Sequence, residues 1–307
     1  MKRRVFAGMG LAALAGSALA LWRSRPAELS DPAFAALFAQ PLVPPEAPVA
    51  VYHLGHSLVG RDMPAMLAQL GGHVWNSQLG WGASLKNHWQ GDVPGLAEEN
   101  RAPVYRPAGQ AVDSGAYPVL VLTEMVDLRD AIRWHDSAAY LAAWASRARA
   151  ANPEVRIYLY ETWPRLDVPE GWAVRVATDR QALWQDQVLR PAVAQVGVIH
   201  VIPGGQVMAA VVAAAEAGDI PGLAGQQDLF SDQIHFTDLG AWLMAMVHFA
   251  VIYGRSPLGL PVALQRADGT LAPGPAKDAA LLMQALVWRV VTGYALTGVT
   301  AGLDTVE

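Results

Sequence analysis

Short apolar runs alternate with helical segments along most of the chain, and this alternation constrains the fold more than any other feature. The strand-like runs are rich in β-branched residues and cover residues 49–54, 74–78, 118–123, 155–160 and 198–202. Segments with the apolar spacing of helices lie between them, chiefly residues 63–70, 137–151 and 177–196. This order predicts βαβ units and a parallel sheet covered by helices on both faces. Ligand-binding residues are then expected just beyond the carboxyl ends of the strands.

Composition excludes several classes of protein. With 307 residues, 53% of them hydrophobic and 16% charged, the chain can bury a sizeable core, which excludes a disordered, coiled-coil or collagen-like protein. The net charge of −5 comes with no basic run beyond the first four residues, so we expect no nucleic-acid partner. The absence of cysteine excludes disulfides, thiolate metal sites and a cysteine nucleophile.

The first residues have the pattern of an export signal. Three basic residues at positions 2–4 precede an uncharged apolar run, residues 5–22, which contains the small-x-small sequence of a cleavage site at residues 18–20. The arginine pair also resembles a twin-arginine signal. The run is just long enough to span a bilayer, so an uncleaved membrane tether through residues 5–22 remains open. We therefore expect residues 1–22 to be a signal peptide or membrane anchor, and the protein to be periplasmic or otherwise extracytoplasmic.

Proline punctuates the next segment and gives the predicted domain boundary. Residues 23–48 contain six prolines, which disfavour regular structure and predict a Pro-rich tether, apart from a short helix near residues 33–39. No second linker of this kind occurs before residues 257–275. The simplest division is therefore one domain over residues 49–307.

Three residues at predicted strand or helix ends have the chemistry of a nucleophilic site. Ser57 directly follows the first strand, and a serine hydroxyl needs a base to become nucleophilic. Asp232 and His235 stand three apart before a helical stretch, residues 238–253. The carboxylate can orient the imidazole while its other nitrogen takes the proton of the serine. Gly82, after the second strand, lacks a Cβ, so its N–H could approach an oxyanion.

These residues resemble the motifs of the SGNH, or GDSL, hydrolases. The first block of that family is matched by Gly55-His56-Ser57-Leu58, the second-block glycine by Gly82, and the fifth block by Asp232-x-x-His235. The resemblance implies a three-layer α/β/α sandwich with a flavodoxin-like, five-stranded parallel sheet. It also implies ester hydrolysis or acyl transfer through an acyl-enzyme, catalysed by Ser57, His235 and Asp232 without a cofactor.

The sequence departs from the family pattern at two places. His56 stands where many members have aspartate, in a structural role or as a contact in the cleft. The third block, Gly-x-Asn-Asp, is replaced by Glu124-Met125-Val126-Asp127, which removes the asparagine that donates to the oxyanion in this family. The oxyanion hole would then consist of the N–H groups of Ser57 and Gly82, with Asn87 as a candidate third donor.

Residues near other strand ends are candidates for substrate binding. Trp81 and Trp163 could form an aromatic rim suited to a sugar face or an acyl chain, and Glu124 could contact substrate. The spacings of the carboxylates and of nearby histidines match no metal-ligand pattern, so no metal site is predicted.

The combined prediction is an exported serine esterase acting on a small-molecule or polysaccharide ester, including O-acetyl groups on carbohydrate. Two alternatives stay open. The same triad could pass the acyl group to a glycan hydroxyl, as an O-acetyltransferase does. The missing asparagine and His56 also fit a non-catalytic glycan-binding or assembly protein.

Overall fold

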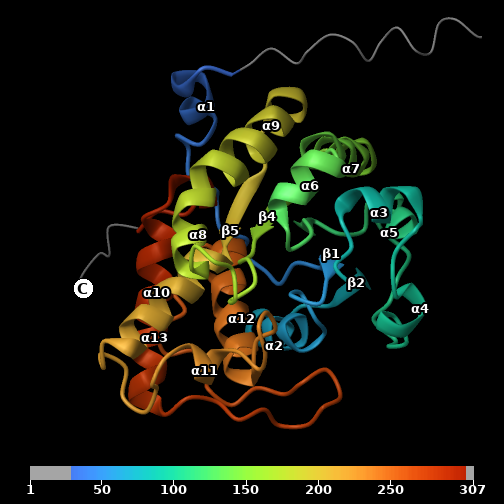
Figure 1. The fold of residues 1–307 in the computed structure, drawn as a ribbon. Coiled ribbons are helices and arrows are strands. Elements are labelled where there is room, and N and C mark those ends of the chain that lie inside the picture. Colours follow the sequence, from blue (N-terminus) through green and yellow to red (C-terminus); the bar gives the residue numbers. More distant parts are fainter. Residues whose placement is uncertain (1–28, 302–307) are drawn as a thin grey trace, which may run out of the picture.

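A five-stranded parallel sheet lies at the centre of the computed structural model, which describes residues 29–301 (Figure 1). The strands are β1 (Val51–His56), β2 (Trp75–Gly80), β3 (Val119–Thr123), β4 (Arg156–Glu161) and β5 (His200–Pro203). Their order is β2-β1-β3-β4-β5, and every neighbouring pair is parallel. The predicted five-stranded parallel sheet is confirmed, and each strand begins within two residues of its predicted start.

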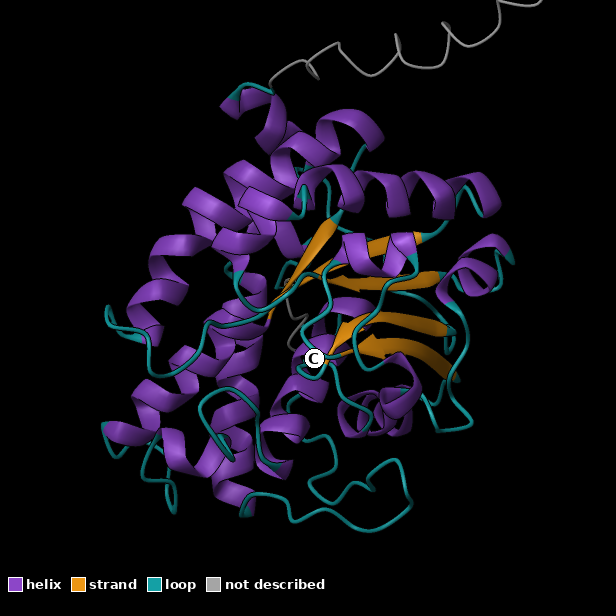
Figure 2. Cartoon of the chain, turned by 45° about the vertical axis from the view of Figure 1, so that its right-hand side comes forward, coloured by secondary structure: helices purple, strands orange, loops and turns teal. Residues whose placement is uncertain are grey.

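The sheet separates two hydrophobic cores. Along β3, Val119 and Val121 point into one core, whereas Leu120 and Leu122 point into the other. Because successive side chains point to opposite faces, a strand such as β3 buries its side chains on both sides of the sheet, and all five of its residues are buried. Helices cover both faces (Figure 2), which confirms the predicted three-layer α/β/α sandwich.

The helices divide between the two cores. On the first face lie α2 (Asp62–Gly71), α8 (Trp172–Asp179), α10 (Gly204–Glu216), α11 (Gln226–Leu229), α12 (Asp238–Tyr253) and α13 (Lys277–Thr292). On the second lie α1 (Asp31–Leu37), α3 (Leu85–Gln90), α5 (Ala108–Asp113), α6 (Leu128–Trp134), α7 (Ser137–Ala151), a π-helix (Arg180–Leu189) and α9 (Arg190–Val196). The short helix α4 (Leu96–Glu99) follows β2, and a 3₁₀ turn (Ala295–Thr297) ends the fold.

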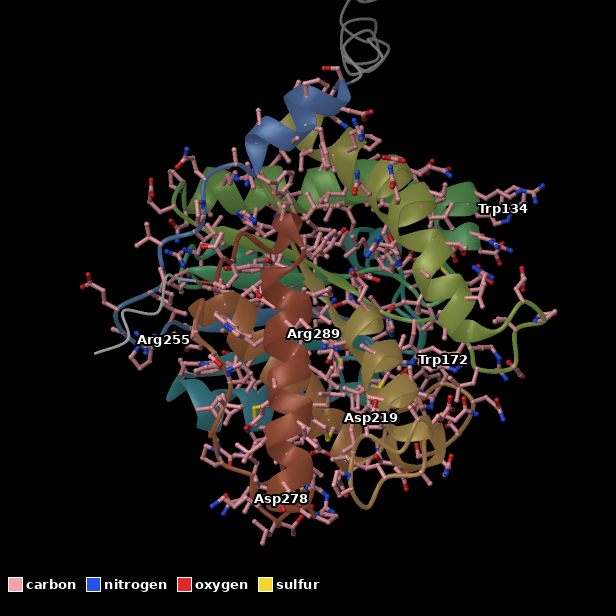
Figure 3. All side chains as sticks on the ribbon, turned by 90° about the vertical axis from the view of Figure 1, so that its left-hand side faces the viewer. Trp134, Trp172, Asp219, Arg255, Asp278 and Arg289 are labelled. Atoms are coloured by element: carbon pink, nitrogen blue, oxygen red, sulfur yellow. The ribbon has the colours of Figure 1, made fainter. Side chains whose placement is uncertain are left out.

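Helix α12 is buried almost all round because α13 covers its outer side. Met283 and Val287 of α13 face inward, while Arg289 stays exposed. Figure 3 shows α13 lying across this face of the molecule, with Asp278 at its lower end. The apolar stretch after residue 279 is therefore a docked amphipathic helix. Within residues 29–301, no helix combines the length and apolarity needed to cross a membrane.

The described part of the segment before β1 packs on the second core. Phe34 and Phe38 are buried there, and the N–H of Leu42 donates to the carbonyl of Gly298 at 2.7 Å. The expected signal peptide or anchor, residues 1–22, lies outside the described residues.

The strand order places a crevice at the end of β1. Because β1 is flanked by β2 and β3, the connections that leave it diverge, and ligands bind at such a switch point. Ser57 directly follows β1, Gly82 follows β2 and Glu124 follows β3. The fold thus brings three predicted site positions to one edge of the sheet.

Candidate active site

Ser57 lies in a tight turn directly after β1. The carbonyl of His56 accepts hydrogen bonds from the N–H groups of Val59, at 2.9 Å, and Gly60, at 3.4 Å. Gly55 allows this strand end to approach β3 closely, since a Cβ there would lie 2.7 Å from the Cβ of Thr123. The turn leaves Ser57 half-buried at the mouth of the crevice.

The predicted base and its carboxylate share one closed loop, residues 230–236. An antiparallel bridge joins Phe230 to Phe236, and the N–H of Ser231 donates to the carbonyl of His235 at 2.8 Å. Trp163 stands two residues after the end of β4, and its indole N–H donates to the carbonyl of Ile234 at 2.9 Å. These bonds fix the loop from within and from the neighbouring strand end.

Ser57, His235 and Asp232 form a hydrogen-bonded row. His235 Nδ1 is 2.7 Å from Asp232 Oδ2, and His235 Nε2 is 2.9 Å from Ser57 Oγ. A carboxylate can only accept, so Nδ1 carries the ring hydrogen and Nε2 of the neutral ring is free to accept from the serine. The row is the geometry in which a histidine can take the proton of a serine nucleophile.

Asp232 stays ionised because the loop surrounds it with donors. Its Oδ1 accepts from the N–H groups of His235 and Ile234, each at 2.7 Å. These backbone bonds, first that of His235, and the bond from the His235 ring lower the pKa of Asp232 to about 2. A negative charge therefore faces the imidazole over the whole physiological range.

Two backbone N–H groups at the site have no acceptor among the described turns and loops, those of Ser57 and Gly82. Gly82 has a φ of 55°, a left-handed conformation that favours glycine, and a Cβ there would meet nothing within 4 Å. Both residues line the same hollow as His235. They are the two donors that the sequence predicted for an oxyanion hole.

The hollow beside the row has a volume of about 580 Å³, a size typical of small-molecule sites. Its walls are mainly apolar and are formed by Trp81, Val126, Pro164, Val168 and Ile234. Two arginines, Arg165 and the buried Arg175, and two carboxylates, Glu99 and Asp127, also line it.

The structure places Trp81, a predicted substrate contact, on this hollow. Its side chain is 56% exposed, its indole N–H donates to Glu99 Oε1 at 2.7 Å, and its ring lies against Gly95, where a Cβ would be 2.3 Å away. The ring is thus a fixed wall.

Ser57 also borders a second hollow, of about 570 Å³. Four charged residues on its lining are Arg61, Asp62, Arg266 and Asp268, and Glu99 lines both hollows. The nucleophile candidate therefore borders both a mainly apolar hollow and a hollow rich in charged residues.

Asn87, the candidate third oxyanion donor, is used elsewhere, and this prediction is wrong. Its Oδ1 accepts from the N–H of Ser84 at 3.0 Å and from the Ser84 hydroxyl at 2.7 Å, and its Nδ2 faces Asp92 at 3.3 Å. Ser84 and Asn87 form the capping box of α3, so the amide closes the helix start instead of facing Ser57.

Two predicted substrate contacts are buried, and both predictions are wrong. Trp163 is 1% exposed and packs edge-on against Phe230 and Phe236, so it supports the loop of the base. Glu124 is 0% exposed and accepts hydrogen bonds from backbone N–H groups. His56 is equally buried; its ring bonds to the carbonyl of Glu124, which favours the structural alternative for this residue.

Sequence reasoning missed two residues that line the apolar hollow, Arg175 and Glu99. Arg175 is largely buried, and its Nε and Nη2 both lie 2.6 Å from Asp179 Oδ2. Its spacing from Asp179 indicated only a helical ion pair. Glu99 gave no local signal because its partner Trp81 lies on a different element. In residues 29–301, no cluster of three or more metal-binding side chains occurs.

The fold and the row define a doubly wound α/β protein with a serine, a histidine and an aspartate aligned at the switch point of its sheet. No family model matches the chain, and no curated protein matches it.

Solved structures similar to the chain include a "putative SGNH hydrolase" from Slackia heliotrinireducens, with 22% identity and a TM-score of 0.40 over 65% of this chain and 96% of the other. A "putative GDSL-like lipase" from Parabacteroides merdae ATCC 43184 has 14% identity and a TM-score of 0.41 over 68% and 96%. A gut microbial diltiazem-metabolizing enzyme has 12% identity and a TM-score of 0.37 over 73% and 50%.

Proposed function

We propose that the chain is a serine hydrolase of the SGNH type that cleaves carboxylic esters through an acyl-enzyme. The observation that carries this proposal is the row from Ser57 Oγ through the His235 ring to Asp232, with distances of 2.9 and 2.7 Å, at the mouth of a hollow. The first- and fifth-block motifs supply these residues.

The proposed reaction has two halves. Ser57 Oγ attacks the carbonyl carbon while its proton passes to His235 Nε2, and the carbonyl electrons move to the oxygen, which the N–H groups of Ser57 and Gly82 stabilise. Collapse expels the alcohol, which takes the proton back from His235, and leaves an ester on Ser57. Water, deprotonated by His235, then releases the acid and restores the serine.

The two hollows support an ester with one apolar and one polar half. Trp81 and its apolar neighbours suit an acyl or aryl group, whereas the charged lining of the second hollow suits a hydroxyl-rich alcohol such as a sugar. O-acetylated carbohydrate is therefore within the proposed substrate class.

Acyl transfer is the second candidate function, favoured by the hollow rich in charged residues beside Ser57, which could admit a glycan hydroxyl in place of water. Product analysis with and without an added oligosaccharide separates the two reactions. Acetylated oligosaccharide indicates transfer, and free acetate alone indicates hydrolysis.

The test of the nucleophile uses a fluorophosphonate probe and p-nitrophenyl acetate on wild type, Ser57→Ala and Ser256→Ala. Ser256 is an exposed serine far along the chain and serves as the matched control. We expect wild type and Ser256→Ala to react alike, and Ser57→Ala to lose labelling and at least about 10³-fold in kcat. Absence of labelling and turnover in wild type would instead favour the non-catalytic glycan-binding protein.

Export belongs to the proposal as well, supported by the basic start and the apolar run at residues 5–22. Fractionation of cells and mass spectrometry of the protein's N-terminus test it. A mature start after residue 20 in the periplasmic fraction supports a cleaved signal, an intact N-terminus in the membrane fraction supports the anchor, and cytoplasmic protein contradicts both.

A further inference from the structure

A fully buried carboxyl group is hydrogen-bonded to the segment that follows Gly82, one of the two candidate oxyanion donors. Glu124 follows β3 at the position where the third sequence block of the SGNH hydrolases begins, and its side chain is 0% exposed. Its Oε1 accepts from the N–H of Met125 at 2.8 Å and from that of Leu85 at 3.3 Å. Oε2 has no hydrogen-bond partner in the described part of the chain.

The main chain of Glu124 is tied to the nucleophile turn. Its carbonyl lies 2.8 Å from His56 Nε2, and the N–H of Leu58 lies 3.3 Å from His56 Nδ1. Since Nδ1 accepts from Leu58, Nε2 carries the hydrogen and donates to Glu124. The His56 ring therefore bonds to the residue that follows Ser57, on one side, and to the end of β3, on the other. It attaches the turn that carries Ser57 to β3.

The side chain of Glu124 is tied to the other half of the hole. Leu85 is the first residue of α3 and stands three residues after Gly82. The carbonyl of Leu85 is held as well, by the indole N–H of Trp144 at 3.1 Å. The carboxyl thus anchors the end of the short loop from which the N–H of Gly82 projects.

We propose that Glu124 is a positioning residue that sets the separation between the N–H groups of Ser57 and Gly82. This role rests on the proposed function, since it matters only if an oxyanion forms there. Glu124 is fully buried and acts at a distance from the substrate. Its main-chain carbonyl acts through His56, a bond that a side-chain substitution keeps, whereas its carboxyl acts through Leu85, a bond that Glu124→Ala removes. A hole with only two backbone donors depends strongly on their spacing, because donors stabilise an oxyanion only within about 2.7–3.1 Å.

The chain contains a matched control at the next strand end. Glu161 ends β4, is 1% exposed, and accepts from Gln206 Nε2 at 2.6 Å. Burial raises the pKa of Glu124 to about 7 and that of Glu161 to about 8, so the two groups have similar surroundings. Among the described residues, the Glu161 side chain bonds to Gln206 and has no hydrogen bond to the segments that carry Ser57 and Gly82.

The experiment compares Glu124→Ala, Glu124→Gln, Glu161→Ala and Glu161→Gln in the full chain, using kcat and KM for p-nitrophenyl acetate and urea unfolding. We expect Glu124→Ala to lower kcat about 100-fold, comparable to the loss of one oxyanion donor, with KM changed less than about threefold. Glu124→Gln keeps an acceptor for Leu85 and Met125 and should restore kcat to within about fivefold of wild type. Both Glu161 variants should lose stability but keep kcat within about threefold.

The outcomes separate this inference from the proposed function. If wild type is active and Glu124→Ala has the same kcat as Glu161→Ala, the positioning role is wrong and the hydrolase proposal stands. If wild type neither turns over nor labels, the proposed function fails first. Should Glu124→Ala not fold, Glu124→Asp and Glu161→Asp decide, because the shorter side chain loses reach to Leu85 and only the former should lower kcat, by about tenfold or more.

Discussion

Asp232 holds His235 at two points, since one carboxylate oxygen accepts from the ring Nδ1 and the other accepts from the His235 main-chain N–H, each at 2.7 Å. The residue thus fixes both the backbone and the imidazole of its partner.

Asp232→Asn should therefore damage catalysis more than folding. The Asn oxygen can keep the backbone bonds, but its NH₂ would face Nδ1 and force the hydrogen onto Nε2, where it opposes the Ser57 hydroxyl. We expect kcat to fall about 10⁴-fold, as the wrong tautomer does in other triads, with a change in unfolding free energy below about 1 kcal/mol. A kcat within tenfold of wild type on p-nitrophenyl acetate would contradict the role of Asp232.

Trp163→Phe should weaken the attachment of the loop that carries the base, residues 230–236, while the phenyl ring still fills most of the buried space. It removes the indole donor to Ile234 and should cost roughly 0.5–1.5 kcal/mol of unfolding free energy, with a drop in kcat of about threefold to tenfold. Trp242→Phe is the matched control, because its buried indole donates to the carbonyl of Pro261, away from the site. Equal kcat values in the two variants would show that Trp163 only fills space.

Trp81→Ala should change specificity and leave stability unaltered. The exposed ring forms a wall of the apolar hollow, so kcat/KM should fall about tenfold for a hexanoate ester and less than about threefold for the acetate. Trp134→Ala serves as control because Trp134 is similarly exposed, at 60%, and does not line the hollow. A uniform loss across the ester series would place Trp81 outside the substrate site.

Stability should fall in acid because of buried histidines near β1. His53 and His248 have ring centroids 6.0 Å apart, and within residues 29–301 neither ring has a hydrogen-bond partner at Nε2. Burial lowers the pKa of His248, like that of His73, to about 4, and that of His53 well below its usual value. These rings are neutral in the folded protein, whereas the unfolded chain binds protons below about pH 6.5.

The stability supplied by each neutral ring is therefore fully present above about pH 6.5 and is lost as the pH falls toward 4. For His248 the loss is up to roughly 3 kcal/mol. Urea unfolding at pH 7 and pH 4.5 should show it, and His248→Phe should reduce the difference. The same difference in wild type and variant would exclude His248 as a cause.

The fold was largely predictable because the sheet is buried on both faces. The strands β1, β3, β4 and β5 are mainly apolar and are almost completely buried, so their positions do not depend on detecting a weak alternation. Helices α7 and α12 match their predicted ranges, and α12 does so as a continuous apolar stretch that is buried almost all round. The predicted helix at residues 177–196 instead contains a ten-residue π-helical section, and side-chain spacing carries no sign of i to i+5 bonding.

Site residues could be predicted from the sequence where they directly follow a strand or a loop. They could not be predicted where packing against a distant segment decides whether a side chain is exposed. Ser57, Asp232 and His235 are brought together because they follow strand or loop ends that meet at the switch point. Trp163 is covered by the distant loop 230–236, which its own surroundings in sequence do not reveal. Asn87 forms a capping box with Ser84, a role that the usual signature does not predict, because that signature has Glu or Gln at the position of Asn87.

The bond between Ser57 and His235 joins residues 178 positions apart, so the nucleophile has no base until both ends of the domain have docked. Closing so long a loop precedes any gain from the contact, which makes this pairing a late event in folding. The rate at which the fluorophosphonate probe begins to label Ser57 therefore reports when folding is complete. After dilution from urea, labelling should appear no earlier than the near-UV dichroism of the tryptophans that pack around the base loop.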